Sequence, residues 1–187
     1  MNFYSIFWKD YFSKRKNESE VTIISTLKSN YLFQGLSPKE LRLVSKFVHI
    51  RNYESGENIF EQNEKGLGMY MITKGSVDIR ITHPEQTNLQ LQVTSLDEGS
   101  LFGEMALTDE EARRTASAYA TSPTTLIGFF KPDLMEIMNR NPEIGVKIFY
   151  QLSKALGKRL TETTEALVHI AANSPTDENL LELKKAA

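Results

Sequence analysis

The stretch Leu101–Ala118, LFGEMALTDEEARRTASA, brings together a glycine, a lone glutamate, a short apolar run and two adjacent arginines. On its own it is compatible with an exposed loop, with a catalytic acid beside its base, or with a cradle for a phosphate. Each possibility needs a different fold around the stretch, so the flanking sequence has to decide among them.

Strand-like patterns surround this stretch. Short apolar segments from Phe47 onward are separated by the turn signals ESGE, NEKG, TKGS and DEGS, and two further segments are broken at Ser122 and Pro123. About eight short strands are typical of a small barrel or jelly roll, which leaves few open sheet edges. Two segments are predicted to be half-buried antiparallel strands because every second residue is apolar: Val77, Ile79 and Ile81, then Leu89, Leu91 and Val93.

Helical signals flank the strand region. Ser37, Pro38 and Glu40 supply a capping residue, a first-turn proline and a capping box, which predict a helix from about Pro38 to Lys46. Helical periodicity returns at KPDLMEIMNR and continues over residues 143–172. The expected fold class is α+β, an antiparallel β-roll (a double-stranded, jelly-roll-like barrel) flanked by N-terminal helices and a long C-terminal helix.

The composition restricts the possible classes of function. The chain has 187 residues, of which 40% are hydrophobic and 25% charged, values that suit one well-packed domain. A formal net charge of −2 gives no overall basic field for nucleic acid, and the absence of cysteine excludes disulfides and thiolate sites. No apolar run approaches the roughly 20 residues of a membrane-spanning helix. The cysteine-free composition favours a cytoplasmic location.

Signatures of catalysis are missing from the sequence. His49, His83 and His169 have no second ligand at metal-binding spacing, and neither a nucleophile elbow nor a Walker loop occurs. Glu104 has no second carboxylate positioned as a catalytic partner. We therefore expect neither an enzyme nor a metal site.

A phosphate cradle suits the stretch better. Gly103 permits a tight turn before the apolar residues 105–107, and the first amides of a helical turn there would carry a partial positive charge. Arg114, ten residues after Glu104, can return on the next strand and donate two hydrogen bonds to the same phosphate. Because a carboxylate repels phosphate, Glu104 is expected to accept a hydrogen bond from a neutral donor such as a ribose hydroxyl.

The motifs FGEMAL, TDEEAR and RTAS resemble, in their order and spacing, the phosphate-binding cassette of the cyclic nucleotide-binding domain family. The resemblance extends from about Leu32 to about Thr164. Within the family, the segment NPEIGVKIFYQLSKALGKRLTETTE is similar to bacterial catabolite activator proteins in particular.

The resemblance implies that the chain binds a cyclic mononucleotide and needs no other cofactor. It implies that Glu104 takes the ribose 2′-hydroxyl and that Arg114 binds the cyclic phosphate. Thr115 raises the possibility of cyclic GMP, whereas the threonines of the long helix favour cyclic AMP. The residues that it assigns to ligand binding are Gly103, Glu104, Met105, Ala106, Arg114, Thr115, Ala116, Arg159, Thr163 and Thr164.

Alternatives stay open for these residues. Glu104 and Arg114 could pair with each other in an empty, degenerate site, and Thr163 could serve only as a polar register-setting residue. The chain would then be a structural adaptor that acts through its long helix and its N-terminal segment. The spacer residues Asp109, Glu110 and Glu111 are expected to be exposed.

The long helix carries apolar residues at heptad spacing, which predicts a homodimer formed by a parallel helix pair. Packing of the helix on its own barrel is the alternative. The residues of this predicted seam, in two series seven apart, are Val146, Ser153, Leu160 and Leu167, and Phe149, Leu156, Thr163 and Ile170.

Four segments are expected along the chain: an aromatic N-terminal helical extension (1–30), the cyclic nucleotide-binding β-roll with flanking helices (31–142), the long helix (143–172) and a short C-terminal helix (173–187). The aromatic residues between 3 and 12 are expected to pack on protein, with contact to a membrane surface as the alternative. The sixteen residues after Ala171 are too few for a DNA-reading domain. The sequence therefore predicts a stand-alone regulatory module that couples ligand binding to helix rearrangement and to a dimer or an unidentified downstream protein, without contacting DNA.

Overall fold

The computed structural model describes residues 21–82, 89–108 and 113–173. The predictions for the aromatic N-terminal segment, His83, the acidic spacer at 109–111 and the short C-terminal helix lie outside these residues. The chain divides into two compact units, and the boundary between Leu152 and Ser153 falls within the long helix α4 (Pro142–Asn173). No helix within the described residues is long and apolar enough to span a membrane.

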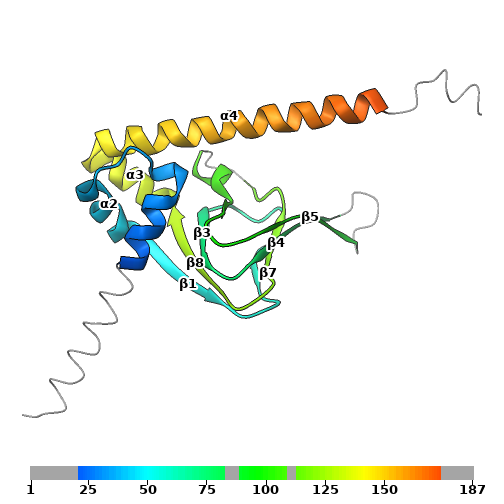
Figure 1. The fold of residues 1–187 in the computed structure, drawn as a ribbon, viewed down its shortest axis with the longest axis horizontal. Helices are drawn as coiled ribbons and strands as arrows, with labels where there is room; N and C mark the ends of the chain where they lie inside the picture. The colour runs from blue at the N-terminus through cyan, green and yellow to red at the C-terminus, as the bar shows by residue number, and fades with distance from the viewer. Residues whose placement is uncertain (1–20, 83–88, 109–112, 174–187) are drawn as a thin grey trace, which may run out of the picture. The chain divides into compact units, whose positions relative to one another are not determined.

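Within the described residues, eight strands form two antiparallel sheets of four strands each, which confirms the predicted β-roll (Figure 1). The first sheet has the order β1-β8-β3-β6, with bounds Val48–Tyr53, Thr124–Phe130, Gly68–Lys74 and Leu101–Phe102. The second sheet has the order β2-β7-β4-β5, with bounds Asn58–Phe60, Ser117–Ala120, Val77–Thr82 and Gln90–Leu96.

Helical elements precede and follow the strands. The capping box is confirmed, because the Glu40 amide donates to Ser37 Oγ at 3.4 Å and the Ser37 amide donates to Glu40 Oε2 at 2.6 Å. The α-helix that it starts is slightly shorter than predicted, since a 3₁₀ turn replaces its last residues. Residues 21–29 are helical, and the other elements are η1 (Tyr31–Phe33), α2 (Pro38–Val44), η2 (Ser45–Phe47), η3 (Glu104–Leu107) and α3 (Lys131–Arg140).

The core is built by side chains from both sheets. Tyr70 on β3 stacks on Phe60 of β2 and Phe102 of β6, with ring centroids 6.2 Å and 5.6 Å apart. Each fully buried aromatic side chain of this kind contributes about 1.5–3 kcal/mol to folding. The buried residues of the cluster are Phe60, Ile72, Val77, Phe102, Ala118 and Leu126.

The prediction that residues 89–93 are half-buried is wrong. Leu89, Leu91 and Val93 are 43%, 41% and 58% exposed. The reason is that β5 is the edge strand of its sheet and pairs with β4 alone. Its ladder also contains a bulge, because Ile79 pairs with Thr94 whereas Arg80 pairs with Gln92.

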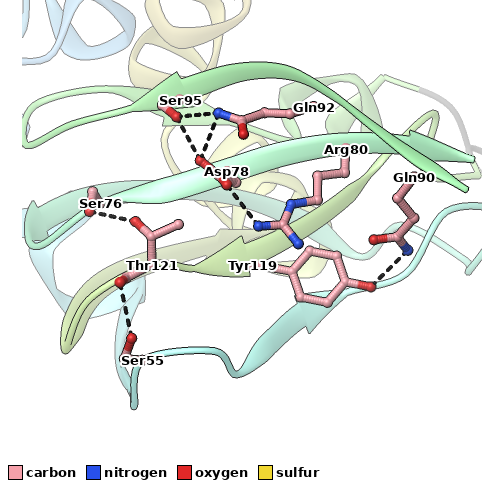
Figure 2. Close-up of polar contacts among 9 residues, drawn as sticks. All are labelled: Ser55, Ser76, Asp78, Arg80, Gln90, Gln92, Ser95, Tyr119 and Thr121. Carbon is pink, nitrogen blue, oxygen red and sulfur yellow. Dashed lines mark hydrogen bonds and ion pairs between the residues drawn. The ribbon is translucent and has the colours of Figure 1, made fainter.

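A buried carboxylate lies where the alternation predicts a solvated strand face. Asp78 on β4 is only 6% exposed. It accepts hydrogen bonds from Ser95 Oγ at 2.6 Å, Gln92 Nε2 at 3.2 Å and Arg80 Nη2 at 2.8 Å (Figure 2). The hydrogen bonds from Arg80 and Ser95 lower the pKa of Asp78 below its ordinary value. This cluster joins β4 to β5 outside the apolar core.

The start of α4 is fixed to the N-terminal helices of the first unit. Ile144, Ile148 and Leu152 are buried. Lys147 Nζ donates to Glu40 Oε1 at 2.8 Å, and the hydrogen bonds from Lys147 and Ser37 lower the pKa of Glu40 to about 2. On the predicted seam, Val146, Phe149, Ser153, Leu160 and Thr163 are exposed, Leu156 is half-buried, and the side chains of Leu167 and Ile170 are not described.

Candidate ligand-binding site

Gly103 makes the turn that the sequence predicts at the start of the site. Its φ of +75° lies in the left-handed region that glycine adopts most readily. The single 3₁₀ turn η3 follows directly and carries Glu104, Ala106 and Leu107 into the protein. A Cβ atom at Gly103 would meet Arg114 Nη1, so this turn has room for the arginine only because residue 103 has no side chain.

Arg114 is a buried cation without a carboxylate partner among the described residues. It is 7% exposed, and its Nη1 donates to the Gly103 carbonyl at 3.1 Å. Its Nε is buried and has no hydrogen-bond partner in the described part of the chain. Its guanidinium carbon lies 4.0 Å from the centroid of the Phe60 ring and 5.9 Å from that of Tyr70.

Burial is the main electrostatic effect at Arg114. It lowers the pKa of the guanidinium below its ordinary value, while Tyr70, Glu64 and Glu104 act in the opposite direction. The direction of this shift means that the charged form is under-solvated in the folded protein. A phosphate that accepted hydrogen bonds from the guanidinium would supply the missing partner.

A loop that the sequence analysis treated only as a turn signal holds the arginine backbone. The Arg114 amide donates to the Glu64 carbonyl at 2.8 Å, and the Asn63 amide donates to the Arg114 carbonyl at 2.8 Å. Asn63 has a φ of +71°, a conformation that asparagine tolerates better than most residues. Arg113 is exposed and donates to the Asn63 carbonyl at 2.8 Å. The asparagine in NEKG was the signal that could have identified this loop.

The other predicted cassette residues differ in their exposure. Glu104 is buried at 2% exposure, and Ala106 is buried as well. The Ala106 amide donates to the Gly103 carbonyl at 3.2 Å, so it is engaged within the turn. Met105 and Thr115 are exposed, and Ala116 is half-buried. The structure thus brings Gly103, Glu104, Ala106 and Arg114 together and leaves Met105 and Thr115 at the surface.

The predicted purine contacts lie on the second unit. Arg159, Thr163 and Thr164 are exposed residues of α4. Thr163 Oγ1 donates to the Arg159 carbonyl and Thr164 Oγ1 to the Leu160 carbonyl, each at 2.8 Å. Their assignment to the purine stays a prediction.

The donor set of the site suits a phosphate and a sugar hydroxyl better than a metal ion. Within the described ranges, no group of three His, Asp or Glu side chains could hold a metal ion. The buried Arg114 offers N–H donors, and the buried Glu104 offers carboxylate oxygens as acceptors.

Known proteins resemble this chain in sequence. Residues 50–141 match the family model for the cyclic nucleotide-binding domain. The cyclic AMP receptor protein of Thermus thermophilus is 35% identical over 136 residues, which are 73% of this chain and 60% of that protein. The cAMP-dependent protein kinase type II regulatory subunit of Drosophila melanogaster is 30% identical over 147 residues, which cover 74% of this chain and 37% of the subunit.

A solved structure agrees with the sequence relatives. The crystal structure of the Thermus thermophilus catabolite activator protein superimposes with a TM-score of 0.67 at 32% identity, over 76% of this chain and 63% of that one. The chain thus spans less than two thirds of these relatives. The matched fold, together with the sequence matches over the cassette, shows that residues 50–141 form a cyclic nucleotide-binding domain and that the chain belongs to this family.

Proposed function

We propose that the chain is a regulatory protein that binds a cyclic mononucleotide, with cyclic AMP as the favoured ligand. The observation that carries this proposal is Arg114, a buried guanidinium with an unfilled Nε donor and no ion-pair partner among the described residues. In a degenerate site closed by a Glu104–Arg114 ion pair, the Glu104 carboxylate would already neutralise the charge of Arg114. The cyclic phosphate carries one negative charge and would accept hydrogen bonds from Arg114.

Glu104 has a separate role in this proposal. Its buried carboxylate would accept a hydrogen bond from the ribose 2′-hydroxyl, which distinguishes a ribonucleotide from its 2′-deoxy analogue. The main-chain groups around Gly103 and Ala106 would line the sugar and phosphate, with Met105, Thr115 and Ala116 beside them.

The choice between the two common cyclic nucleotides depends on the relatives and on Thr115. Two of the relatives named above carry cyclic AMP in their names, which supports that ligand. Thr115 is exposed and offers a hydroxyl next to Arg114, which is the argument for cyclic GMP. Arg159, Thr163 and Thr164 are proposed to contact the purine of either ligand.

The direct test is calorimetric titration of the protein with cyclic AMP, cyclic GMP and, as an unrelated control, cyclic di-GMP. We expect saturable binding of cyclic AMP with cyclic GMP weaker. Arg114→Met should weaken binding at least about tenfold, because a hydrogen-bonded charge contributes about 1.5–3 kcal/mol. Arg113→Met removes the neighbouring exposed charge and should leave the affinity unchanged. Folded wild-type protein that binds none of the three ligands would overturn the proposal.

We further propose that ligand binding changes the long helix and, through it, a homodimer or a downstream protein. The exposed apolar side chains of Val146, Phe149 and Leu160 at heptad spacing support this proposal. In sedimentation velocity, Leu160→Glu should dissociate the dimer. Thr161→Glu places the same charge one residue away from the seam and should leave the dimer intact. An unchanged dimer in Leu160→Glu would remove the helix pair from the proposal.

The same proposal treats the protein as a regulator and not as an enzyme. The two relatives named above are a receptor protein and a regulatory subunit, which supports a binding role. The cysteine-free composition supports a cytoplasmic location.

A further inference from the structure

The guanidinium of Arg114 lies over the face of an aromatic ring, as in the stacked arrangement in which arginine contacts a ring through its own face. Its central carbon lies 4.0 Å from the centroid of the Phe60 ring, close enough for a strong cation–π interaction. The Tyr70 ring is the second aromatic neighbour, at 5.9 Å. Both the cation and Phe60 are buried, so water screens their attraction little.

Contact through the face leaves the edge of the guanidinium available. All five N–H donors of arginine lie in the plane of the group, whereas an aromatic ring binds its face. Within the described residues, the side chain makes one hydrogen bond, from Nη1 to the Gly103 carbonyl, and Nε is left without a partner. A carboxylate at the same place would also have stabilised the charge, but it would have occupied these donors.

Arg80 shows the alternative arrangement in the same molecule. Its guanidinium also lies over an aromatic ring, that of Tyr119 at 5.0 Å, but its Nη2 donates to Asp78 at 2.8 Å. The charge of Arg80 is thus already neutralised by a partner. Within the described ranges, Arg114 has the aromatic contact but no carboxylate as an ion-pair partner.

The Phe60 ring is itself fixed by its neighbours. It stacks on Tyr70 with an interplanar angle of 26° and packs against Phe102 with centroids 5.8 Å apart. Phe60 ends β2, directly before the loop whose Asn63 and Glu64 hydrogen-bond to the Arg114 backbone. One continuous segment therefore holds both the main chain and the guanidinium of Arg114.

We propose that Phe60 is a positioning residue for Arg114, whose ring stabilises the buried cation by its face and keeps the in-plane N–H donors open to a phosphate. This inference rests on the proposed function, in which Arg114 binds the cyclic phosphate. It assigns to Phe60 an effect on ligand affinity that a core residue contributing only apolar burial would not have.

The test replaces Phe60 by mono-, di- and trifluorinated phenylalanine and measures the Kd for cyclic AMP by calorimetry. Fluorine withdraws electron density from the ring face with little change in size, so affinity should fall stepwise with the number of fluorines. Phe60→Leu should weaken binding on the order of 3- to 20-fold. Phe129→Leu, which alters the core contact between Phe129 and Phe33 and touches neither Phe60 nor Arg114 in any contact given above, should change the Kd less than twofold. An affinity that is independent of fluorination would overturn the proposal.

A second readout is independent of nucleotide binding. In ligand-free protein, the Arg114 Nε–H resonance, identified by its loss in Arg114→Lys, should shift with each fluorine and in Phe60→Leu but stay in place in Phe129→Leu. If the wild type binds no cyclic nucleotide, the proposed function fails, and this resonance alone decides whether Phe60 holds Arg114. A resonance that does not respond to Phe60 substitution would overturn the inference, whatever the affinity data show.

Discussion

Asp78 and Arg114 are both buried charges on the β-roll, but their surroundings are opposite. Asp78 is 6% exposed and accepts hydrogen bonds from three side chains, those of Arg80, Gln92 and Ser95 (Figure 2). Arg114 is 7% exposed, has no carboxylate partner among the described residues and keeps an unfilled Nε donor. Burial of an unpaired charge destabilises a fold, whereas a fully hydrogen-bonded one is tolerated.

The contrast separates a structural charge from one that is available to a ligand. Asp78 already has its hydrogen-bond partners, so its loss should lower the free energy of unfolding. Under the proposed function, Arg114 gains a phosphate as its partner when the ligand binds, so its loss should lower the affinity for the ligand. The predictions below use this difference, and each would fail if the two charges had the same role.

The largest expected effect is on folding. Asp78→Ala removes the acceptor of hydrogen bonds from Arg80, Gln92 and Ser95, and it also removes the ion-pair partner of Arg80. We expect the free energy of unfolding to fall by about 2–3 kcal/mol, measured by urea denaturation at pH 7. Asp97→Ala removes an exposed carboxylate soon after β5 and should cost less than about 0.5 kcal/mol. Equal effects of the two substitutions would show that the Asp78 cluster is not structural.

A smaller effect on stability is expected from adding a methyl group to the turn beside Arg114. Gly103→Ala adds a methyl group to a residue with φ +75° and directs it at Arg114 Nη1. Gly56 has a similar φ, +87°, but a Cβ there would meet no atom within 4 Å. Gly56→Ala should therefore lower the free energy of unfolding only by the backbone strain, about 1 kcal/mol. Gly103→Ala should lower it by about 2 kcal/mol, as measured by urea denaturation. Gly103→Ala alone should also weaken cyclic AMP binding. Identical behaviour of the two variants would mean that the Gly103 turn does not set the position of Arg114.

The pH dependence of the unfolding free energy should also distinguish the two charges. Hydrogen bonds from Arg80 and Ser95 lower the pKa of Asp78 below its ordinary value of 3.8, so its stabilising contribution is complete above that value and is lost as pH falls below it. The difference in unfolding free energy between wild type and Asp78→Asn should stay constant from about pH 7 to pH 5 and narrow below about pH 4.

Arg114 should show the opposite sign and a weaker dependence on acid, because burial outweighs the favourable effect of the Glu64 and Glu104 carboxylates on its charge. Its pKa is lowered by burial, so the protonated form costs folding free energy at every pH below that pKa. Arg114→Met should therefore leave ligand-free stability unchanged or slightly raised between pH 3 and pH 7, as urea denaturation at each pH would reveal. If the stability difference between wild type and Arg114→Met changed at low pH as strongly as that for Asp78→Asn, Arg114 would have an ion-paired carboxylate, contrary to what the described residues show.

Much of the fold was predictable from local signals. Alternating residues on β4, the glycine turns and the capping box at Ser37 are each encoded within a few residues, so the β-roll and α2 followed from them. The exposure of Leu91 and Val93 could not be predicted in this way, because alternation identifies a strand but not whether that strand lies at a sheet edge.

The candidate site was predictable in part for the same reason. Gly103, Glu104 and Arg114 lie in one continuous stretch, whose pattern could be identified in the sequence. The Phe60 ring is separated from Arg114 by more than fifty residues. The pairing of β2 with β7 and the backbone hydrogen bonds of Asn63 and Glu64 to Arg114 bring them together. The burial of Asp78 likewise depends on Gln92 and Ser95 from the neighbouring strand.

The most direct test of the central claim measures two quantities on two variants. Arg114→Met and Asp78→Asn would each be titrated with cyclic AMP by calorimetry and unfolded in urea at pH 7. We predict at least a tenfold weaker Kd with unchanged stability for Arg114→Met, and lower stability with a Kd within about twofold of wild type for Asp78→Asn. An Arg114→Met protein that lost stability and retained wild-type affinity would contradict the account.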